Sequence, residues 1–116
     1  MKRPLAYITA AWSGDKYKDT DQAARYCREV YEAGFSPICP ALYMSMFTNS
    51  AIPEEHKSRK DMSRELLRRS RVLVVCGKYV NEETKSDIAI AARLGITATT
   101  LDGILTVKGH GKSKYD

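Results

Sequence analysis

The sequence predicts a single α/β domain with an open parallel sheet of four or five strands and helices on both faces. Short apolar segments alternate with segments whose apolar residues recur at helical spacing along nearly the whole chain. The segment 72–76 is apolar throughout, as expected for a strand covered on both faces. The length of 116 residues suits one domain, since chains near this length bury roughly two-thirds of their unfolded surface in one core.

The first unit is a strand followed by a helix. Residues 5–11 form an apolar run short enough for a buried strand, and a loop at residues 13–15 ends it. Apolar side chains then recur at helical spacing opposite a charged face, and Gly34 ends this helix. These apolar residues are Ala23, Cys27, Val30 and Tyr31.

The second unit joins a short strand to a long helix. Residues 35–39 form the strand, which Pro40 closes, and residues 41–52 are irregular and rich in large side chains. Pro53, followed by two acidic residues, is typical of a first helical turn. We expect this helix to continue to about Ser70.

The third unit leads from strand 72–76 through helix 82–94 to a fourth strand at residues 95–101. The alternation of strands and helices implies parallel strands with right-handed crossovers, in a Rossmann-like or flavodoxin-like arrangement. We assign residues 1–103 to this domain. The polar, glycine-rich residues 104–116 are expected to form a mobile tail.

Composition argues against two classes of protein. No apolar run approaches the roughly 20 residues that a membrane-spanning helix needs. The net charge of +5 could indicate nucleic-acid binding. However, much of the excess lies in helix 53–70 and in the tail with Lys108, Lys112 and Lys114, and a solvated helix face explains the first cluster at least as well. No aromatic residues are interleaved with the basic residues of these two clusters, as a groove for single strands would require. We therefore expect a small, phosphorylated ligand rather than nucleic acid or a membrane.

Cysteine and histidine usage favours a cytoplasmic protein without a metal or cofactor. The three cysteines are widely spaced among apolar neighbours, which is typical of reduced core thiols rather than a disulfide framework. The start of the chain resembles a signal peptide superficially, but its apolar run is needed as the first strand. Neither His56 nor His110 has partners at metal-ligand spacing or beside a nucleophilic serine.

A ligand pocket is expected where the strands end. In an open parallel sheet, ligands bind outside the carboxyl ends of the strands. Trp12 and Tyr79 follow two such ends and could stack on a planar base, although Trp12 also suits core packing. Gly77 would let the backbone approach a ligand, or would serve only the turn. Ala10 lies at the end of the first strand and completes this group.

Asp87 is the candidate carboxylate of the pocket. It lies one helical turn after Glu83, near the start of a helix. Acids are favoured there by the helix dipole alone, so a structural role and a functional role both remain open. A functional carboxylate would need a hydroxyl partner to orient it, and Tyr7 on the first strand is the candidate.

Seven segments together resemble the nucleoside 2-deoxyribosyltransferase-like superfamily, and more closely its small bacterial and phage domains of unknown function. The resemblance runs from about residue 5 to residue 101. The segments are YITAAWSGD at residues 7–15, ARYC at 24–27, EAGFSPICP at 32–40, LLRRS at 66–70, VVCG at 74–77, DIAIA at 87–91 and LGI at 94–96.

The resemblance implies a nucleoside or nucleotide ligand and chemistry at its N-glycosidic bond. Enzymes of this superfamily cleave or transfer that bond through a carboxylate that attacks the anomeric carbon. The resemblance places this nucleophile at Asp87, with Tyr7 orienting it and Trp12 beside the base or sugar. It also assigns substrate-binding positions to Asp15, Asn81 and Glu83, besides Ala10, Gly77 and Tyr79.

The chain differs from the superfamily pattern at several of these positions. Asp87 stands where the pattern has glutamate, Glu83 replaces a glycine, Asn81 a serine, and Arg71 an acid. Two alternatives to an enzyme therefore remain open. One is an inactive module that senses or sequesters a nucleotide. The other is a protein-interaction domain that uses five basic residues of helix 53–70, namely Lys57, Arg59, Lys60, Arg64 and Arg68.

The resemblance also implies a dimer or larger homo-oligomer, because superfamily enzymes commonly complete their pockets with a neighbouring subunit. The segment with Tyr43, Met44, Met46 and Phe47 has an unusual density of large side chains. We expect it to form either an apolar contact surface between subunits or packing over the domain itself.

Overall fold

The computed structural model describes residues 3–104 and forms one four-stranded, all-parallel sheet in the order β2-β1-β3-β4. The predicted class, an α/β open sheet of the Rossmann-like type, is confirmed. The elements are β1 (Leu5–Ala10), α1 (Lys16–Glu32), β2 (Ser36–Ile38), α2 (Pro40–Tyr43), the 3₁₀ turn η1 (Met44–Met46), α3 (Pro53–Arg68), β3 (Val72–Cys76), α4 (Glu82–Leu94) and β4 (Thr97–Thr100).

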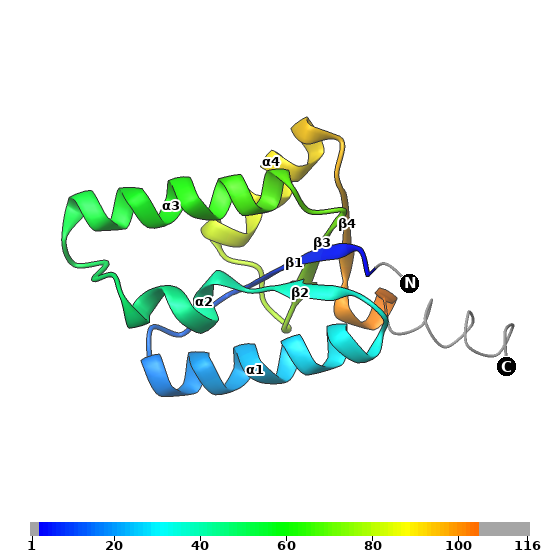
Figure 1. Ribbon diagram of the computed structural model, residues 1–116, viewed down its shortest axis with the longest axis horizontal. Coiled ribbons are helices and arrows are strands. Elements are labelled where there is room, and N and C mark those ends of the chain that lie inside the picture. Colours follow the sequence, from blue (N-terminus) through cyan, green and yellow to red (C-terminus); the bar gives the residue numbers. More distant parts are fainter. Residues whose placement is uncertain (1–2, 105–116) are drawn as a thin grey trace, which may run out of the picture.

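Helices cover both faces of the sheet. Figure 1 shows α1 on one side and α3 with α4 on the other. Successive side chains of β1 alternate between the two faces, as a strand requires. Ile8 packs in the core with Val30 of α1, whereas Tyr7 packs with Leu67 of α3 and Ala91 of α4. Strand β1 is therefore buried from both sides at the centre of the fold.

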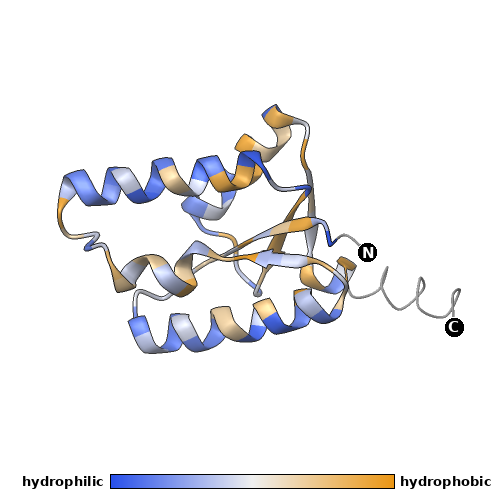
Figure 2. Ribbon diagram, in the orientation of Figure 1, coloured by the Kyte–Doolittle hydropathy of each residue, from blue (hydrophilic) through white to orange (hydrophobic). Residues whose placement is uncertain are grey.

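The hydropathy pattern explains this layering. Figure 2 shows β3 largely hydrophobic and α3 predominantly hydrophilic, with few hydrophobic positions. In β3, Val72, Val74 and Cys76 contribute to the core on the α1 side, while Leu73 and Val75 contribute to the core on the α3 and α4 side. A strand with two buried faces needs apolar residues at every position, whereas a surface helix needs only a stripe.

The fourth strand is shorter than predicted and is largely exposed. Gly95 ends α4 in the left-handed conformation, with φ 73°, so the strand begins only at Thr97. Strand β4 lies at the edge of the sheet, and Thr97, Ala98 and Thr100 are exposed. Residues 101–104 then begin a helical turn. Burial at an edge is incomplete, which accounts for the threonines there.

Residues 105–116 of the predicted tail lie outside the described residues, which stop at 104. Ile104, its first residue, is only 5% exposed and packs in the core on the α1 side. Residues 41–52, expected to be irregular, contain the single helical turns α2 and η1 before α3 begins. Across residues 3–104, no helix is long and apolar enough to cross a membrane.

Candidate functional site

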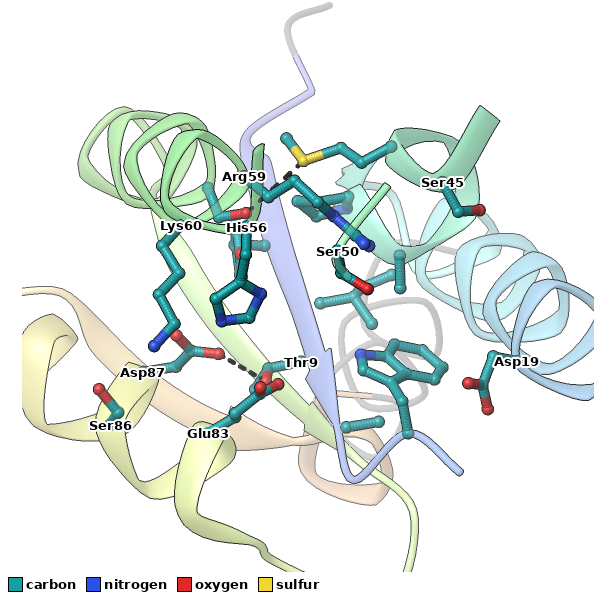
Figure 3. A pocket seen from close by; sticks show the side chains of 18 of the residues that line it. Thr9, Asp19, Ser45, Ser50, His56, Arg59, Lys60, Glu83, Ser86 and Asp87 are labelled. Atoms are coloured by element: carbon teal, nitrogen blue, oxygen red, sulfur yellow. Dashed lines mark hydrogen bonds between the residues drawn. The ribbon is translucent and has the colours of Figure 1, made fainter. Parts of the chain in front are cut away.

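The strand order creates a crevice beside the carboxyl end of β1. The chain passes from β1 to β2 on one side and later returns to β3 on the other, so the order reverses at β1. Such reversal points are where open α/β sheets bind ligands. A cavity of about 650 Å³ lies there, walled by the end of β1, the start of α1, the segment at residues 40–50, α3 and α4. Figure 3 shows this cavity from close by.

The wall formed by β1 carries Tyr7 and Thr9, which lie two positions apart on the same face of the strand. Thr9 is 4% exposed. Its Oγ1 donates a hydrogen bond to Oδ2 of Asp87 at 2.7 Å, drawn as a dashed line in Figure 3. This bond ties the end of β1 to the first half of α4.

Asp87 is a partly buried carboxylate on the cavity wall. Burial raises its pKa above the ordinary value, because removal from water disfavours the charged form. The negative charge of Glu83 acts in the same direction. The hydrogen bond from Thr9 and the positive charge of Arg64 oppose the shift by favouring the carboxylate. Asp87 therefore carries its charge at some cost in solvation, which distinguishes it from a surface acid.

Tyr7 lies close to Asp87, but the orienting hydroxyl on Asp87 belongs to Thr9. Tyr7 is 5% exposed and lines the same cavity. Its pKa is raised by burial first and by the charge of Asp87 second, while the Ser63 hydroxyl lowers it. The hydrogen bond expected from Tyr7 is supplied by Thr9 instead. The alternation of strand side chains places both residues on one face, so the sequence did contain a signal for Thr9.

Helix α3 forms a basic wall that the sequence-based pocket did not include. Five of its residues line the cavity at spacings of three and four, which puts them on one helical face. They are His56, Arg59, Lys60, Ser63 and Arg64. Two other basic residues of α3, Lys57 and Arg68, do not line the cavity. Lys57 is exposed, and the guanidinium of Arg68 lies 3.9 Å from the carboxylate of Glu65. Of the five basic residues proposed to contact a protein partner, three thus line the cavity and two lie elsewhere on the helix surface.

Helix α4 forms the opposing acidic wall. Glu82, Glu83, Ser86 and Asp87 line the cavity from its first two turns. Glu82 also pairs with Lys85 at 3.6 Å. Figure 3 shows Glu83 and Asp87 projecting from α4, while His56, Arg59 and Lys60 project from α3 on the other side. Basic side chains of α3 and acidic side chains of α4 therefore line the same cavity, and the charge of Arg64 acts on Asp87.

Trp12 lies at the cavity wall and also packs in the core. The ring lines the cavity and also packs against the core on the α1 side. Its centroid lies 6.2 Å from that of Tyr26, with the two ring planes tilted by 51°. Ala10, at the end of β1, lines the cavity as well. Trp12 thus links the cavity wall to the core on the α1 side, where its ring also meets that of Tyr26.

Four predicted site residues lie outside the cavity. Asp15 is the N-cap of α1, and its carboxylate accepts hydrogen bonds from the backbone N–H groups of residues 17 and 18. Asn81 caps α4 in the same way, accepting from the N–H of Thr84 at 2.9 Å. Tyr79 is 77% exposed. The side chains at positions 15 and 81 are already used in helix capping.

Gly77 is the fourth, and its role is conformational. Its φ is +88°, a backbone conformation that glycine adopts readily and other residues rarely adopt. A Cβ at this position would lie 3.3 Å from the hydroxyl of Tyr26. The glycine lets the chain turn after β3 beside that hydroxyl. The turn explanation considered from the sequence accounts for Gly77, which does not line the cavity.

The segment at residues 41–52 contributes both cavity and surface. Met44 is 2% exposed and lines the cavity, together with Ser45 and Ser50. Tyr43 and Phe47 stack with ring centroids 6.3 Å apart and are exposed.

Within residues 3–104, no group of three or more His, Cys, Asp or Glu side chains could hold a metal ion.

Comparison with protein families finds one family whose sequence model matches most of the chain. The model of the Domain of unknown function (DUF7768) matches residues 4–101, a range that includes every strand and every residue lining the cavity. A search of curated proteins finds no match. The expected kinship with a domain of unknown function is confirmed at this level. The chain belongs to the DUF7768 family, a domain family of unknown function.

Proposed function

We propose that the cavity binds a nucleoside or nucleotide and that Asp87 attacks its anomeric carbon, so that the protein cleaves or transfers an N-glycosidic bond. The observation that carries this proposal is the Asp87 carboxylate on the wall of the cavity, held at 2.7 Å by Thr9 at the end of β1. The resemblance to the nucleoside 2-deoxyribosyltransferase-like superfamily suggests the same position.

The environment of Asp87 suits a nucleophile. Partial burial disfavours the charged form, while Thr9 and Arg64 favour it, so the carboxylate is available without being fully solvated. In the first step, an Asp87 oxygen bonds to the anomeric carbon, and the bond from that carbon to the base nitrogen breaks. The base keeps the electron pair and takes a proton from water. Water or a second base then displaces Asp87 and completes hydrolysis or transfer.

Trp12 and Tyr7 supply supporting contacts. Trp12 lines the cavity beside the end of β1, where its ring can stack on a base. The raised pKa of Tyr7 keeps its phenol protonated, so it can donate a hydrogen bond toward the sugar or toward Asp87. Neither residue changes its bonds in the reaction.

The test incubates the protein with a panel of 2′-deoxynucleosides, their 5′-monophosphates and NAD, and measures the release of free base by chromatography. Wild-type protein should release base from at least one of them, and Asp87→Ala and Asp87→Asn should abolish the reaction. The matched control is Asp61→Asn, because Asp61 is exposed on α3 and does not line the cavity. Absence of base release from the whole panel with folded wild-type protein overturns the enzymatic proposal.

A second candidate function is binding without turnover. Glu83 lines the cavity one helical turn from Asp87, where the superfamily pattern has glycine. An aspartate is also about 1.5 Å shorter than glutamate, and a misplacement of about 1 Å can cost about 100-fold in rate. An inactive module predicts stoichiometric nucleotide binding by calorimetry, with no product and with little change in Asp87→Asn.

The proposal also includes a cytoplasmic homo-oligomer. Cys27, Cys39 and Cys76 are unpaired thiols, which suits a reducing compartment. Met46 and Phe47 are 76% and 61% exposed, so these side chains, with Tyr43, are available to a second subunit, whereas the buried Met44 is not. Light scattering at micromolar concentration tests this, and a monomer contradicts the assembly.

A further inference from the structure

Three cations on α3 line the cavity, and one of them, Arg64, also acts through its charge on Asp87. Arg59 is half-buried, while Lys60 and Arg64 are exposed on the cavity side of the helix. Among residues 3–104, no ion pair includes any of the three. Several other cations of the helices pair locally at positions three or four residues away. These are Arg25, Arg28, Arg68, Arg69 and Lys85.

The three cations could be shared by one anion. Lys60 and Arg64 are one helical turn apart, which corresponds to about 6 Å along the helix axis. Arg59 and Lys60 both project from α3 toward the cavity in Figure 3, on either side of His56. An arginine offers a planar fork that matches phosphate oxygens, and a lysine adds a compact charge. Ser45 and Ser50 line the same cavity and can donate further hydrogen bonds.

The alternative place for an anion, the N-terminus of α4, is unsuited to it. A helix N-terminus commonly holds phosphate because its first N–H groups are free and its dipole is positive there. In α4, Glu82 and Glu83 occupy the first turn, and the amide oxygen of Asn81 accepts from the N–H of Thr84. These acids would repel a phosphate. Of these two helices, α3 is therefore the better place for the negative end of a ligand.

We propose that α3 holds the phosphate of the ligand through Arg59, Lys60 and Arg64, and that the site takes phosphorylated nucleosides in preference to free nucleosides. This inference rests on the proposed function and specifies its substrate class. It places the phosphate on the wall opposite Glu83. The sugar then lies between the two walls, within reach of Asp87.

The experiment is calorimetric titration of the full chain with a 2′-deoxynucleoside, its 5′-monophosphate and inorganic phosphate. The monophosphate should bind at least about 10-fold more tightly than either of the others. Removing one hydrogen-bonding cation should weaken monophosphate binding by about 10- to 100-fold. Arg59→Ala and Lys60→Ala should both show this loss, with nucleoside affinity changed by less than about 2-fold. Arg64 is left intact, because its charge also acts on Asp87.

The matched control is Lys57→Ala. Lys57 lies on α3 only three residues from Lys60, but it is exposed and does not line the cavity. Its removal should leave monophosphate affinity unchanged. Circular dichroism of each variant verifies that the fold is kept, and Lys60→Arg should retain most of the affinity.

The outcomes separate the two proposals. Equal binding of nucleoside and monophosphate, or an equal loss in Lys57→Ala and Lys60→Ala, overturns the α3 phosphate site while the nucleoside pocket stands. Inorganic phosphate binding as tightly as the monophosphate makes α3 a site for the free ion and also overturns the inference. Absence of binding by both nucleoside and monophosphate overturns the nucleotide pocket, and the inference with it.

Discussion

The Thr9 hydroxyl donates to the Asp87 carboxylate at 2.7 Å and so joins two residues 78 positions apart in the chain. Thr9 is nearly fully buried, whereas Asp87 is only partly buried at the cavity wall. The bond orients the carboxylate and lowers the cost of its charge. It also connects the central strand to the helix that carries the acidic wall.

Replacing Thr9 by valine should remove this bond with little change in shape. We expect the pKa of Asp87 to rise further, because the carboxylate loses its donor. The free energy of unfolding should fall by about 1 to 3 kcal/mol. An NMR titration of the Asp87 carboxyl carbon and chemical denaturation measure the two effects. Thr9→Ser keeps the hydroxyl and is the control, and an unchanged pKa in Thr9→Val contradicts the orienting role.

Asp87→Asn should stabilise the protein at neutral pH. The folded-state pKa of Asp87 lies above the ordinary value of 3.8, chiefly because of burial. The native state therefore binds the proton more tightly, and stability falls as the pH rises from 3.8 through the folded-state pKa. The variant should gain over wild type above this window and lose the gain below it. Urea denaturation at several pH values tests this, and a gain independent of pH contradicts it.

Tyr7→Phe should make the protein more resistant to alkali. Burial and the charge of Asp87 raise the pKa of Tyr7 above its ordinary value of 10.0. The contribution of this phenol to stability is therefore present below pH 10 and is lost as the pH rises through the folded-state pKa. Phenolate absorbance and circular dichroism, followed together, should show Tyr7 ionising with unfolding. Tyr17→Phe is the control, since Tyr17 is 85% exposed.

Arg3 fastens the start of β1 to the end of α1, and its loss should destabilise the fold. Its Nη1 donates to the backbone carbonyls of Tyr31 and Phe35, each at 2.9 Å. The guanidinium carbon also lies 4.2 Å from the centre of the Tyr31 ring. We expect Arg3→Ala to cost about 1 to 2 kcal/mol of unfolding free energy. Arg3→Lys retains the charge and N–H donors but loses the planar guanidinium that lies against the Tyr31 ring, so it should recover only part of the loss.

Much of the fold could be predicted because its signals are local. The helical spacing of apolar residues, the apolar run at 72–76 and the cap at Asn81 act within a few residues of the chain. The boundaries of the fourth strand were predicted less well, because it lies at the sheet edge, outside the central core, and begins at Thr97 rather than at Gly95. Local signals identify an element well and its last residue poorly.

The site was predicted only in part. Asp87, Tyr7, Ala10, Trp12 and Glu83 do line one cavity. Of the residues expected beside them after β3, Gly77 turns the chain, Asn81 caps α4 and Tyr79 is exposed. Capping and turning use the same residue types that a ligand site uses. The residues of α3 were missed because their positive charges were attributed to a solvated face.

The sequence by itself determined the α/β class, the order of the elements and the acid at position 87, since these follow from periodicity and composition. Only the tertiary structure decided that Thr9 holds Asp87 and that the basic face of α3 lies across a cavity from the acids of α4. The physical reason is that these relationships depend on two crossovers, from β2 to β3 through α3 and from β3 to β4 through α4. The crossovers place residues 56–64 and 82–87 around the end of β1, and no local sequence pattern indicates contacts between residues so far apart in the chain.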